Sequence, residues 1–525
     1  MIGGLASAAM GPSIISARSA PAAGRTVRAV MHADLRVFDP IWTTATITSY
    51  HGAMVYDTLF GQDEQGRPQP QMVGKWGTSD DKLTYTFTLR DGLKFSDGSP
   101  VTAADCVASI RRWQIRDGAG THMFRRVKDT PVVDDKTFQI VLSERYGLVI
   151  EALSKISSSQ CFVMRKKEAE TDPNQQVRTI IGSGPFLYNA DESRPGNRYV
   201  YDPSPSYVPR SEPASGMAGG KVVKIDRAIF ENISDEQTAL SALQAGEVDF
   251  CEAPPQDMLA DLEKDSNLTV DIINTTGRVL VMRMNCLQPP FDNVEARRAM
   301  LYVVDQEAIM QAIFGQSKAW RKCGAYFSCG NPMENDENTE WFKTGPNSKK
   351  AAELFKKAGY DGRPVVVLQA TDNTFANPAA MLTAQGLRQA GVNVDLAPMD
   401  WGAVVTRRAS KKPISEGGWN TFFTASFGSE LVDPIAFGAH AATGEKGWFG
   451  WPKDDLQEKL RDRWATAETA EQRKELAREM QRNAWNYVPQ VYCGQFYPRS
   501  VWRKNLTGVL KIPQIVAFWN MEKKT

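Results

Sequence analysis

The stretch that decides the fold is Lys82–Trp113, KLTYTFTLRDGLKFSDGSPVTAADCVASIRRW. Apolar residues and threonines alternate over residues 83–89, which predicts a half-buried β-strand. Two Asp-Gly pairs follow, the first at Asp91, and they are turn signals. Thr102 lies three residues before Asp105, as in a capping box, and apolar residues at helical spacing come next. The stretch therefore predicts a strand, a turn, a short strand, a second turn and a helix.

The same residues resemble the signature of a known family. The block from Phe87 to Asp105 is similar, almost residue for residue, to the family 5 solute-binding proteins, the extracytoplasmic receptors of peptide-type and nickel-type ABC importers. Weaker similarities follow in the family's order: the Gly-Ser-Gly-Pro-Phe turn at 182–186 and the helix with Arg297 and Ala299 are two of them. The similarities extend from about residue 27 to residue 500, and so cover nearly the whole chain.

The resemblance implies an α/β fold with two lobes, the type II-like periplasmic-binding-protein fold, and an extra subdomain inserted in the first lobe. Strand-helix-strand patterns over residues 222–250 and 365–396 agree with α/β sheets, in which ligands bind at the carboxyl ends of the strands. The expected segments are a signal peptide at 1–25, lobe I at 26–60, the inserted subdomain at 61–181, lobe I again at 182–277, lobe II at 278–490 and lobe I at 491–525.

Composition and charge exclude several classes of protein. The chain has 525 residues, of which 42% are hydrophobic and 23% charged, and its net charge is +1. This near balance gives no general attraction to nucleic acid or to an anionic membrane. No stretch after the N-terminus approaches the roughly 20 apolar residues of a membrane span. We expect a monomeric globular protein with no nucleic-acid partner.

The N-terminal residues are small and apolar, and Ala20-Pro21-Ala22 is a small-residue cleavage site, as in a secretory signal peptide. A basic leader is missing, because the first arginine is Arg18. One hypothesis is that a charged leader, twin-arginine in type, lies upstream; the alternative is a disordered tail. No cysteine for a lipid anchor precedes Cys106. The expected location is the periplasm of a Gram-negative cell.

Cysteine and histidine placement bears on covalent and metal chemistry. Cys323 and Cys329 enclose five residues, GAYFS, which allows a local disulfide in an oxidising compartment, or two reduced thiols. The four histidines show no ligand-pair spacing. We expect no structural metal and no cofactor.

An extracytoplasmic hydrolase is the competing class of function. A serine hydrolase would need a Gly-x-Ser-x-Gly elbow, and Gly182-Ser183-Gly184 lacks that spacing. We therefore expect a binding protein and no enzyme. A receptor for a nickel or other metal chelate, as in one branch of the resembled family, remains an alternative.

The resemblance also implies where a ligand is held. Trp401 follows a predicted strand and would line the space between the lobes. In peptide-binding relatives an aspartate takes the ligand's ammonium group, and Glu430 stands at that position here, three residues before Asp433. Alternatively, Trp401 is a core residue, Glu430 a solvated loop acid and Asp433 a turn former. The predicted ligand-binding residues are Trp401, Phe427, Glu430, Asp433, Trp419, Tyr326 and Phe327, the last two at the rim near the disulfide.

One departure from the resembled family affects the expected ligand. Dipeptide-binding relatives place an arginine shortly before an Asn-Pro pair to bind the ligand's free carboxylate through bidentate bonds. Before Asn377-Pro378 this chain has residues 373–376, Asn-Thr-Phe-Ala, with no arginine. We therefore expect a peptide-like or amine-bearing small solute, delivered to the permease of an ABC transporter.

Overall fold

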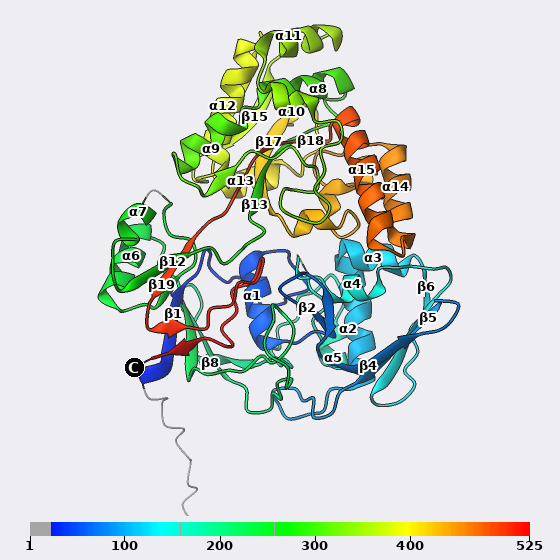
Figure 1. Cartoon of the computed structure of the whole chain (residues 1–525), viewed down its shortest axis with the longest axis vertical. Helices are drawn as coiled ribbons and strands as arrows, with labels where there is room; N and C mark the ends of the chain where they lie inside the picture. The colour runs from blue at the N-terminus through cyan, green and yellow to red at the C-terminus, as the bar shows by residue number, and fades with distance from the viewer. Residues whose placement is uncertain (1–22, 158, 257, 525) are drawn as a thin grey trace, which may run out of the picture.

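The computed structural model describes residues 23–157, 159–256 and 258–524. The expected signal peptide at 1–25 lies almost wholly outside these residues. The described chain forms two lobes, one above the other in Figure 1, and chain segments cross between them near residues 277 and 497. No helix within these described ranges combines the length and the apolar character needed to cross a membrane.

The first lobe is built on a seven-stranded sheet whose strands come from distant parts of the chain. The strand order is β12-β19-β11-β1-β10-β9-β8. β1 pairs in parallel with β10 on one side and with β11 on the other. The strands are β1 Thr26–Val30, β8 Phe186–Arg194, β9 Arg198–Pro203, β10 Arg227–Glu231, β11 Phe250–Cys251, β12 Leu268–Asp271 and β19 Ser500–Arg503.

Three helices belong to this lobe: α1 (Thr46–Val55), α6 (Glu236–Ala245) and α7 (Leu259–Leu262). α6 connects β10 to β11, as the sequence predicts, and Gly246 ends it in the left-handed conformation at φ 80°. Its N-cap is Asp235, whose side chain accepts the N–H of Thr238. The predicted parallel strands lie in one sheet, but β1 separates them.

A separate antiparallel sheet of four strands, in the order β4-β5-β7-β6, lies to the right of the first sheet in Figure 1. Its strand β5 is the alternating segment of the deciding stretch, and Thr102 and Asp105 form the predicted capping box of α2. The elements of this region are β2 Phe60–Gln62, β3 Pro68–Pro70, β4 Val73–Thr78, β5 Thr84–Leu89, β6 Val127–Asp129, β7 Thr137–Leu142, α2 Ala103–Arg116, α3 Gly118–Phe124, α4 Val149–Ser154 and α5 Lys166–Ala169.

The chain returns from this region to the first sheet through the predicted Gly-rich turn. A Cβ atom at Gly182 would collide with the backbone of Val55 at the end of α1, so only glycine fits there. The hydroxyl of Ser183 accepts the N–H of Asp57 and donates to the carbonyl of Val163. The turn is thus a structural junction between the first sheet and the inserted region.

The second lobe has a six-stranded sheet in the order β14-β18-β13-β17-β15-β16. β15, α12 and β16 form the predicted strand-helix-strand unit with parallel pairing. The strands are β13 Arg278–Met284, β14 Trp320–Arg321, β15 Val365–Ala370, β16 Val394–Met399, β17 Thr421–Phe427 and β18 Gln490–Phe496. The helices are α8 Val294–Val303, α9 Gln306–Phe314, α10 Glu340–Thr344, α11 Ser348–Lys357, α12 Ala376–Gln389, α13 Trp401–Arg407, α14 Asp455–Thr466 and α15 Ala470–Tyr487.

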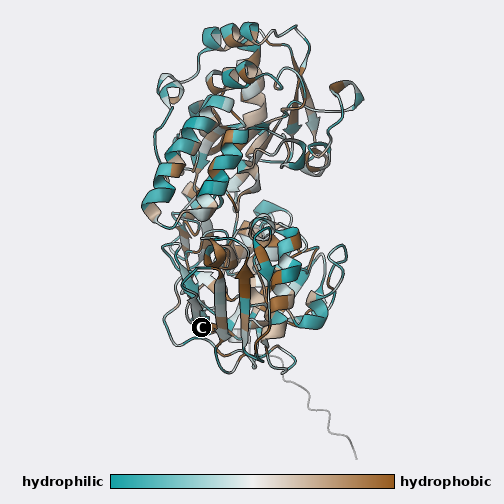
Figure 2. Ribbon diagram, turned by 90° about the vertical axis from the view of Figure 1, so that its right-hand side faces the viewer, coloured by the Kyte–Doolittle hydropathy of each residue, from teal (hydrophilic) through white to brown (hydrophobic). Residues whose placement is uncertain are grey.

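In both lobes, apolar strands lie inside and helices with polar surfaces cover them. Figure 2 shows brown strands inside the lower lobe and largely teal helices around the upper one. The strands β13, β15 and β18 are almost wholly buried along their length. The core of each lobe therefore lies between its sheet and the covering helices.

The strand pairing places the chain's return from the second lobe to the first later than the sequence predicts. β18 pairs with β13 through Phe496, and β19 pairs with strands of the first sheet from Ser500. The second lobe thus extends to Phe496, whereas the last segment of lobe I was expected from residue 491. After the crossing, β20 (Leu506–Thr507) pairs with β21 (Glu522–Lys523). The side chain of Lys523 donates to Asp249, which ties the C-terminal segment to the first sheet.

A second contact joins the lobes on the side of the inserted region. The turn between α14 and α15 lies against α3 and α4 in Figure 1. Gly147 N–H donates to the carbonyl of Ala465 at 2.9 Å. Glu468 forms ion pairs with Lys82 at 3.0 Å and with Arg145 at 3.8 Å. We call these five residues the α14–α15 contact.

Candidate functional site

Two polar side chains lie where parallel strands of the first sheet end. β1 and β11 are neighbours, with Val30 beside Cys251. His32 follows β1 and Glu252 follows β11, so both lie at the carboxyl edge of the sheet. The backbone N–H and Nδ1 of His32 lie 2.9 and 2.7 Å from one carboxylate oxygen of Glu252, and Tyr50 of α1 donates its hydroxyl to the other at 2.7 Å.

These contacts keep Glu252 ionised. Burial raises the pKa of the Glu252 carboxyl, but the charge of His32 and hydrogen bonds from His32 and Tyr50 outweigh burial. The net pKa lies below the usual 4.5. The first lobe therefore presents a fixed negative charge at this edge.

The facing edge of the second lobe carries an arginine and an aromatic ring. β13 begins at Arg278 and runs antiparallel to β17, which ends at Phe427, so the two residues pair directly. The guanidinium carbon of Arg278 lies 5.0 Å from the centre of the Phe427 ring. Directly after β17, Glu430 accepts the N–H of Phe427 at 3.1 Å.

Electrostatic interactions connect these two edges. Burial lowers the pKa of Arg278, and interactions with the Tyr50 hydroxyl and with the carboxylates of Glu430 and Glu252 oppose that effect. Two of these partners belong to the first lobe and one to the second. We call the connected group the interlobe cluster; its members are His32, Tyr50, Glu252, Arg278, Phe427 and Glu430.

A third side of the cluster comes from the inserted region. Lys155 pairs with Asp117 at 2.5 Å, and both side chains are buried. Burial raises the pKa of Glu430 and of Asp433, while the nearby charge of Lys155 lowers both. Asp433 also accepts the N–H of Ile435 at 2.9 Å, so it shapes the turn before α14 as well as facing Lys155.

Trp401 lies at the carboxyl end of β16 and begins α13. It is half-buried, and its backbone N–H donates to Asp372, which follows β15. The guanidinium of Arg408 lies 5.6 Å from its ring, and burial lowers the pKa of Arg408 to about 10. The same guanidinium lies over the rings of Phe422, Trp448 and Phe449. Trp401 thus lies at the carboxyl edge of the sheet, as predicted for a residue between the lobes. It contacts Arg408 and no member of the interlobe cluster that the structure describes.

Trp419 is a core residue, contrary to its predicted place among the ligand-contacting side chains. It is fully buried, and its indole N–H donates to the carbonyl of Ser410 at 3.1 Å. Its ring packs edge-on against Phe422 and at an angle against Trp451. The indole is therefore part of the core of the second lobe.

Tyr326 and Phe327 are also core residues, so they do not form the predicted rim. Both are fully buried. Tyr326 stacks on His440 at 4.3 Å between ring centres, and Phe327 stacks on Trp464 at 5.8 Å. The disulfide that encloses them is present: Cys323 and Cys329 are joined with an S–S distance of 2.02 Å.

Four members of the interlobe cluster were missed by sequence reasoning. Glu430 and Phe427 were predicted, but His32, Tyr50, Glu252 and Arg278 were not. Their signal lay in position: His32 and Glu252 each follow the end of a strand of the first sheet within two residues. The pairing of two strands that are more than 200 residues apart could not be read from the sequence alone.

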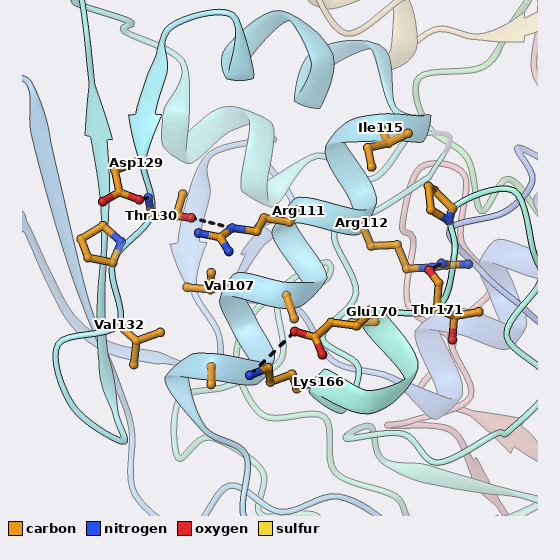
Figure 3. Close-up of a pocket in the computed structure, with 15 residues that line it drawn as sticks. Val107, Arg111, Arg112, Ile115, Asp129, Thr130, Val132, Lys166, Glu170 and Thr171 are labelled. Carbon is orange, nitrogen blue, oxygen red and sulfur yellow. Dashed lines mark hydrogen bonds and ion pairs between the residues drawn. The ribbon is translucent and has the colours of Figure 1, made fainter.

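The structure also has a pocket outside the interlobe region. It has a volume of about 440 Å³ and lies between α2, α5 and residues 129–132 (Figure 3). Arg111 donates to Thr130 across it, and Lys166 pairs with Glu170 at its edge. None of its lining residues belongs to the interlobe cluster. Within the described part of the chain, no three His, Cys, Asp or Glu side chains gather as a metal site would require.

Comparisons with known proteins agree with this architecture. Residues 67–442 match the family model described as bacterial extracellular solute-binding proteins, family 5, middle part. A protein of Sinorhizobium fredii, described as a probable peptide ABC transporter periplasmic-binding protein, is 46% identical over 514 residues, which cover 98% of this chain and 96% of that protein.

Solved structures show the same fold at low sequence identity. The murein tripeptide binding protein of Escherichia coli matches with a TM-score of 0.79 at 18% identity and covers 96% of this chain and 99% of its own. A periplasmic binding protein of A. tumefacien R10, solved with agropinic acid, matches with a TM-score of 0.77 at 21% identity and covers 95% and 99%. These matches confirm the predicted two-lobed fold.

Proposed function

Because the chain belongs to the family 5 bacterial extracellular solute-binding proteins, whose members serve ABC importers, we propose that it captures a peptide-like or amine-bearing small solute between its lobes. The substrate-binding role in import is the family's role, and the family resemblance in the sequence is confirmed. We further propose that the receptor is a monomer, delivers its solute to membrane permease subunits and catalyses no reaction. The family acts outside the cytoplasm; no finding supports the twin-arginine route, which stays a hypothesis.

The observation that carries this proposal is the position of Glu430. It follows β17 at the lobe-facing edge of the second sheet, where its carboxylate accepts the backbone N–H of Phe427. Among the described residues, its one hydrogen-bond donor is the Phe427 N–H. A carboxylate with spare acceptor capacity suits an ammonium group, which donates three hydrogen bonds.

Asp433 and Trp401 complete the proposed binding surface. Asp433 is partly buried, and the same Lys155 charge that acts on Glu430 acts on it. Trp401 offers a half-buried ring at the neighbouring strand end. Polar anchors among aromatic walls are the usual make-up of a small-solute site.

A peptide mixture with and without free amines tests the proposal. The protein, stripped of bound solute, is heated with an enzymatic casein hydrolysate or with the same hydrolysate after acetylation of its amines. We expect the untreated peptides to raise the melting temperature, since a ligand at 100 times its Kd stabilises by about 2.7 kcal/mol. Acetylated peptides should bind at least about tenfold more weakly, the loss expected for one charge-assisted bond.

Two variants assign the effect to one side chain. Glu430→Gln should respond equally weakly to both mixtures, while Glu416→Gln, an exposed residue of the same lobe, should behave like the parent protein. Equal stabilisation of the parent protein by both mixtures would contradict the proposal that Glu430 binds an amine of the solute. No stabilisation by either mixture would reject a peptide-like solute.

A further inference from the structure

Arg278 is a partly buried arginine whose hydrogen-bonding groups are largely unused by the fold. Its Nε has no partner. Its Nη2 lies 3.5 Å from the carbonyl of Ala425, at the outer limit of a hydrogen bond. No carboxylate of the described residues lies within 4.0 Å of it. A guanidinium presents five N–H donors, so most of its binding capacity is left over.

Two buried arginines of this lobe have more hydrogen-bond acceptors within the fold. Arg283 donates to the carbonyls of Phe449 and Ala439 and to the side chain of Gln490. Arg297 donates to three backbone carbonyls at the end of its helix and nearby. In both cases the fold supplies three acceptors, although Nη2 of Arg283 has no partner among the described residues. For Arg278 the fold supplies no acceptor at the usual hydrogen-bonding distance. Its N–H donors are therefore available to a group that is not part of the fold.

The neighbouring carboxylates do not fill that role. Glu252 already accepts from His32 and Tyr50, and Glu430 accepts from the Phe427 N–H. Both act on Arg278 only through space. A partly buried guanidinium with few hydrogen-bonded partners favours an incoming anion, which would gain two parallel bonds to it.

The surroundings of Arg278 favour an organic anion over a bare ion. Its Cα pairs with those of Phe427 on one side and Phe496 on the other, so aromatic side chains flank it in the sheet. The ring of Phe496 packs against that of Phe375 at 4.7 Å between centres. A carboxylate bound here would therefore have apolar ring surface beside it for the rest of the solute.

We propose that the guanidinium of Arg278 binds a carboxylate group of the solute, while Glu430 binds its ammonium group. The inference rests on the proposed function and narrows it: the solute class is zwitterionic, an amino-acid derivative or peptide with a free carboxylate. The sequence offered no carboxylate-binding arginine at 373–376. The structure offers one from a different strand, at the same edge of the sheet.

Blocking the carboxylates of the peptide mixture tests the inference. Treatment with acidic methanol converts the carboxyl groups of the casein hydrolysate to methyl esters and leaves the amines intact. We expect the esterified mixture to bind the parent protein at least tenfold more weakly than the untreated mixture, measured from melting temperatures over a concentration series. Equal binding of both mixtures would overturn the role of Arg278 and leave the proposed function standing. No binding of either mixture would overturn both.

Variants of Arg278 provide the second readout. Arg278→Gln should lower affinity for the untreated peptides and erase the preference over the esters. Arg278→Lys should keep part of that preference, because lysine retains the charge but not the planar pair of donors. Arg298→Gln, on the outer helix α8 and ion-paired to Glu295, is the matched control and should keep the full preference. A full preference in Arg278→Gln would contradict the assignment.

Discussion

At the scale of single residues, Glu430 makes the protein sensitive to pH. Burial raises the pKa of its carboxyl above the usual 4.5, against the lowering effect of the Phe427 N–H and of the Lys155 and Arg278 charges. An acid with a raised pKa binds its proton more tightly in the folded protein than in the unfolded chain. Its contribution to stability is therefore complete below pH 4.5 and is lost as the pH rises through the folded pKa.

Replacing Glu430 with glutamine should remove this titration. In the solute-free protein, the melting temperature of Glu430→Gln should equal that of the parent at pH 4 and exceed it increasingly toward pH 7. Thermal unfolding at several pH values measures the difference, in which the other titrating groups cancel. A difference that stays constant with pH would show that Glu430 is not buried in solution.

The type of a residue did not reveal whether it belongs to the site or to the core. Trp419, Tyr326 and Phe327 have the aromatic character of a ligand wall, but their neighbours in space make them core residues. Tyr326 packs on Trp485 and Tyr492, which lie more than 150 residues later in the chain. Glu430 was predicted from a local motif that surrounds it. Arg278 has no such motif, and only strand pairing places it beside Phe427.

At the scale of helices and strands, local chemistry predicted most boundaries. Thr102 and Thr469 begin α2 and α15 as capping boxes, and Gly246 and Gly391 follow helices in the left-handed conformation. Such signals lie within a few residues of the boundary that they set, so they can be read in the sequence.

One pair of strands was missed for a physical reason. Residues 191–220 are rich in Pro, Gly and Ser, a composition that predicts a long surface loop. The first part is instead a hairpin, because β8 continues to Arg194, turns at Gly196 and returns as β9. Gly196 adopts φ 82°, as a tight turn requires, and long-range pairing of β9 with β10 stabilises strands that local preference does not favour.

The capping box of α2 should contribute measurably to stability. The Thr102 hydroxyl accepts the N–H of Asp105, whose carboxylate accepts the N–H groups of Thr102 and of Lys166 at the start of α5. Thr102→Ala should lower the free energy of unfolding by about 1 kcal/mol. Urea unfolding followed by tryptophan fluorescence measures this.

Thr78→Ala provides the comparison for that variant, since Thr78 is exposed at the end of β4 in the same region. It should change stability by no more than about 0.5 kcal/mol, as for an ordinary surface site. Equal losses in the two variants would indicate that the cap contributes nothing beyond the general cost of removing a threonine side chain.

At the scale of the whole molecule, the α14–α15 contact bears on how long the lobes stay together. Glu468 pairs with Lys82 and Arg145, and all three side chains are about half exposed. Each such pair stabilises by at most about 1 kcal/mol. Reversing the charge with Glu468→Lys should therefore weaken solute binding by roughly two- to fivefold at low ionic strength, mainly through faster release.

Salt and a compensating variant check this expectation. The effect should vanish near 1 M salt, where the screening length falls to about 3 Å. Adding Lys82→Glu to Glu468→Lys should restore part of the affinity. Glu471→Lys makes the same charge change three residues later, in the first turn of α15, without an ion pair among the described residues, and should have little effect. Stopped-flow release of bound peptides distinguishes the variants.

The crossings between the lobes have a consequence for engineering and for inheritance. Arg278 and Phe496, the first and last strand residues of the second lobe, are paired neighbours in β13 and β18, so their Cα atoms lie about 5 Å apart. The second lobe is encoded by one uninterrupted stretch of sequence, a cassette whose first and last residues lie side by side in the structure. Exchanging this cassette between relatives would transplant Arg278, Phe427 and Glu430 in a single step. A change of cargo could therefore be acquired by one recombination event that leaves the first lobe untouched.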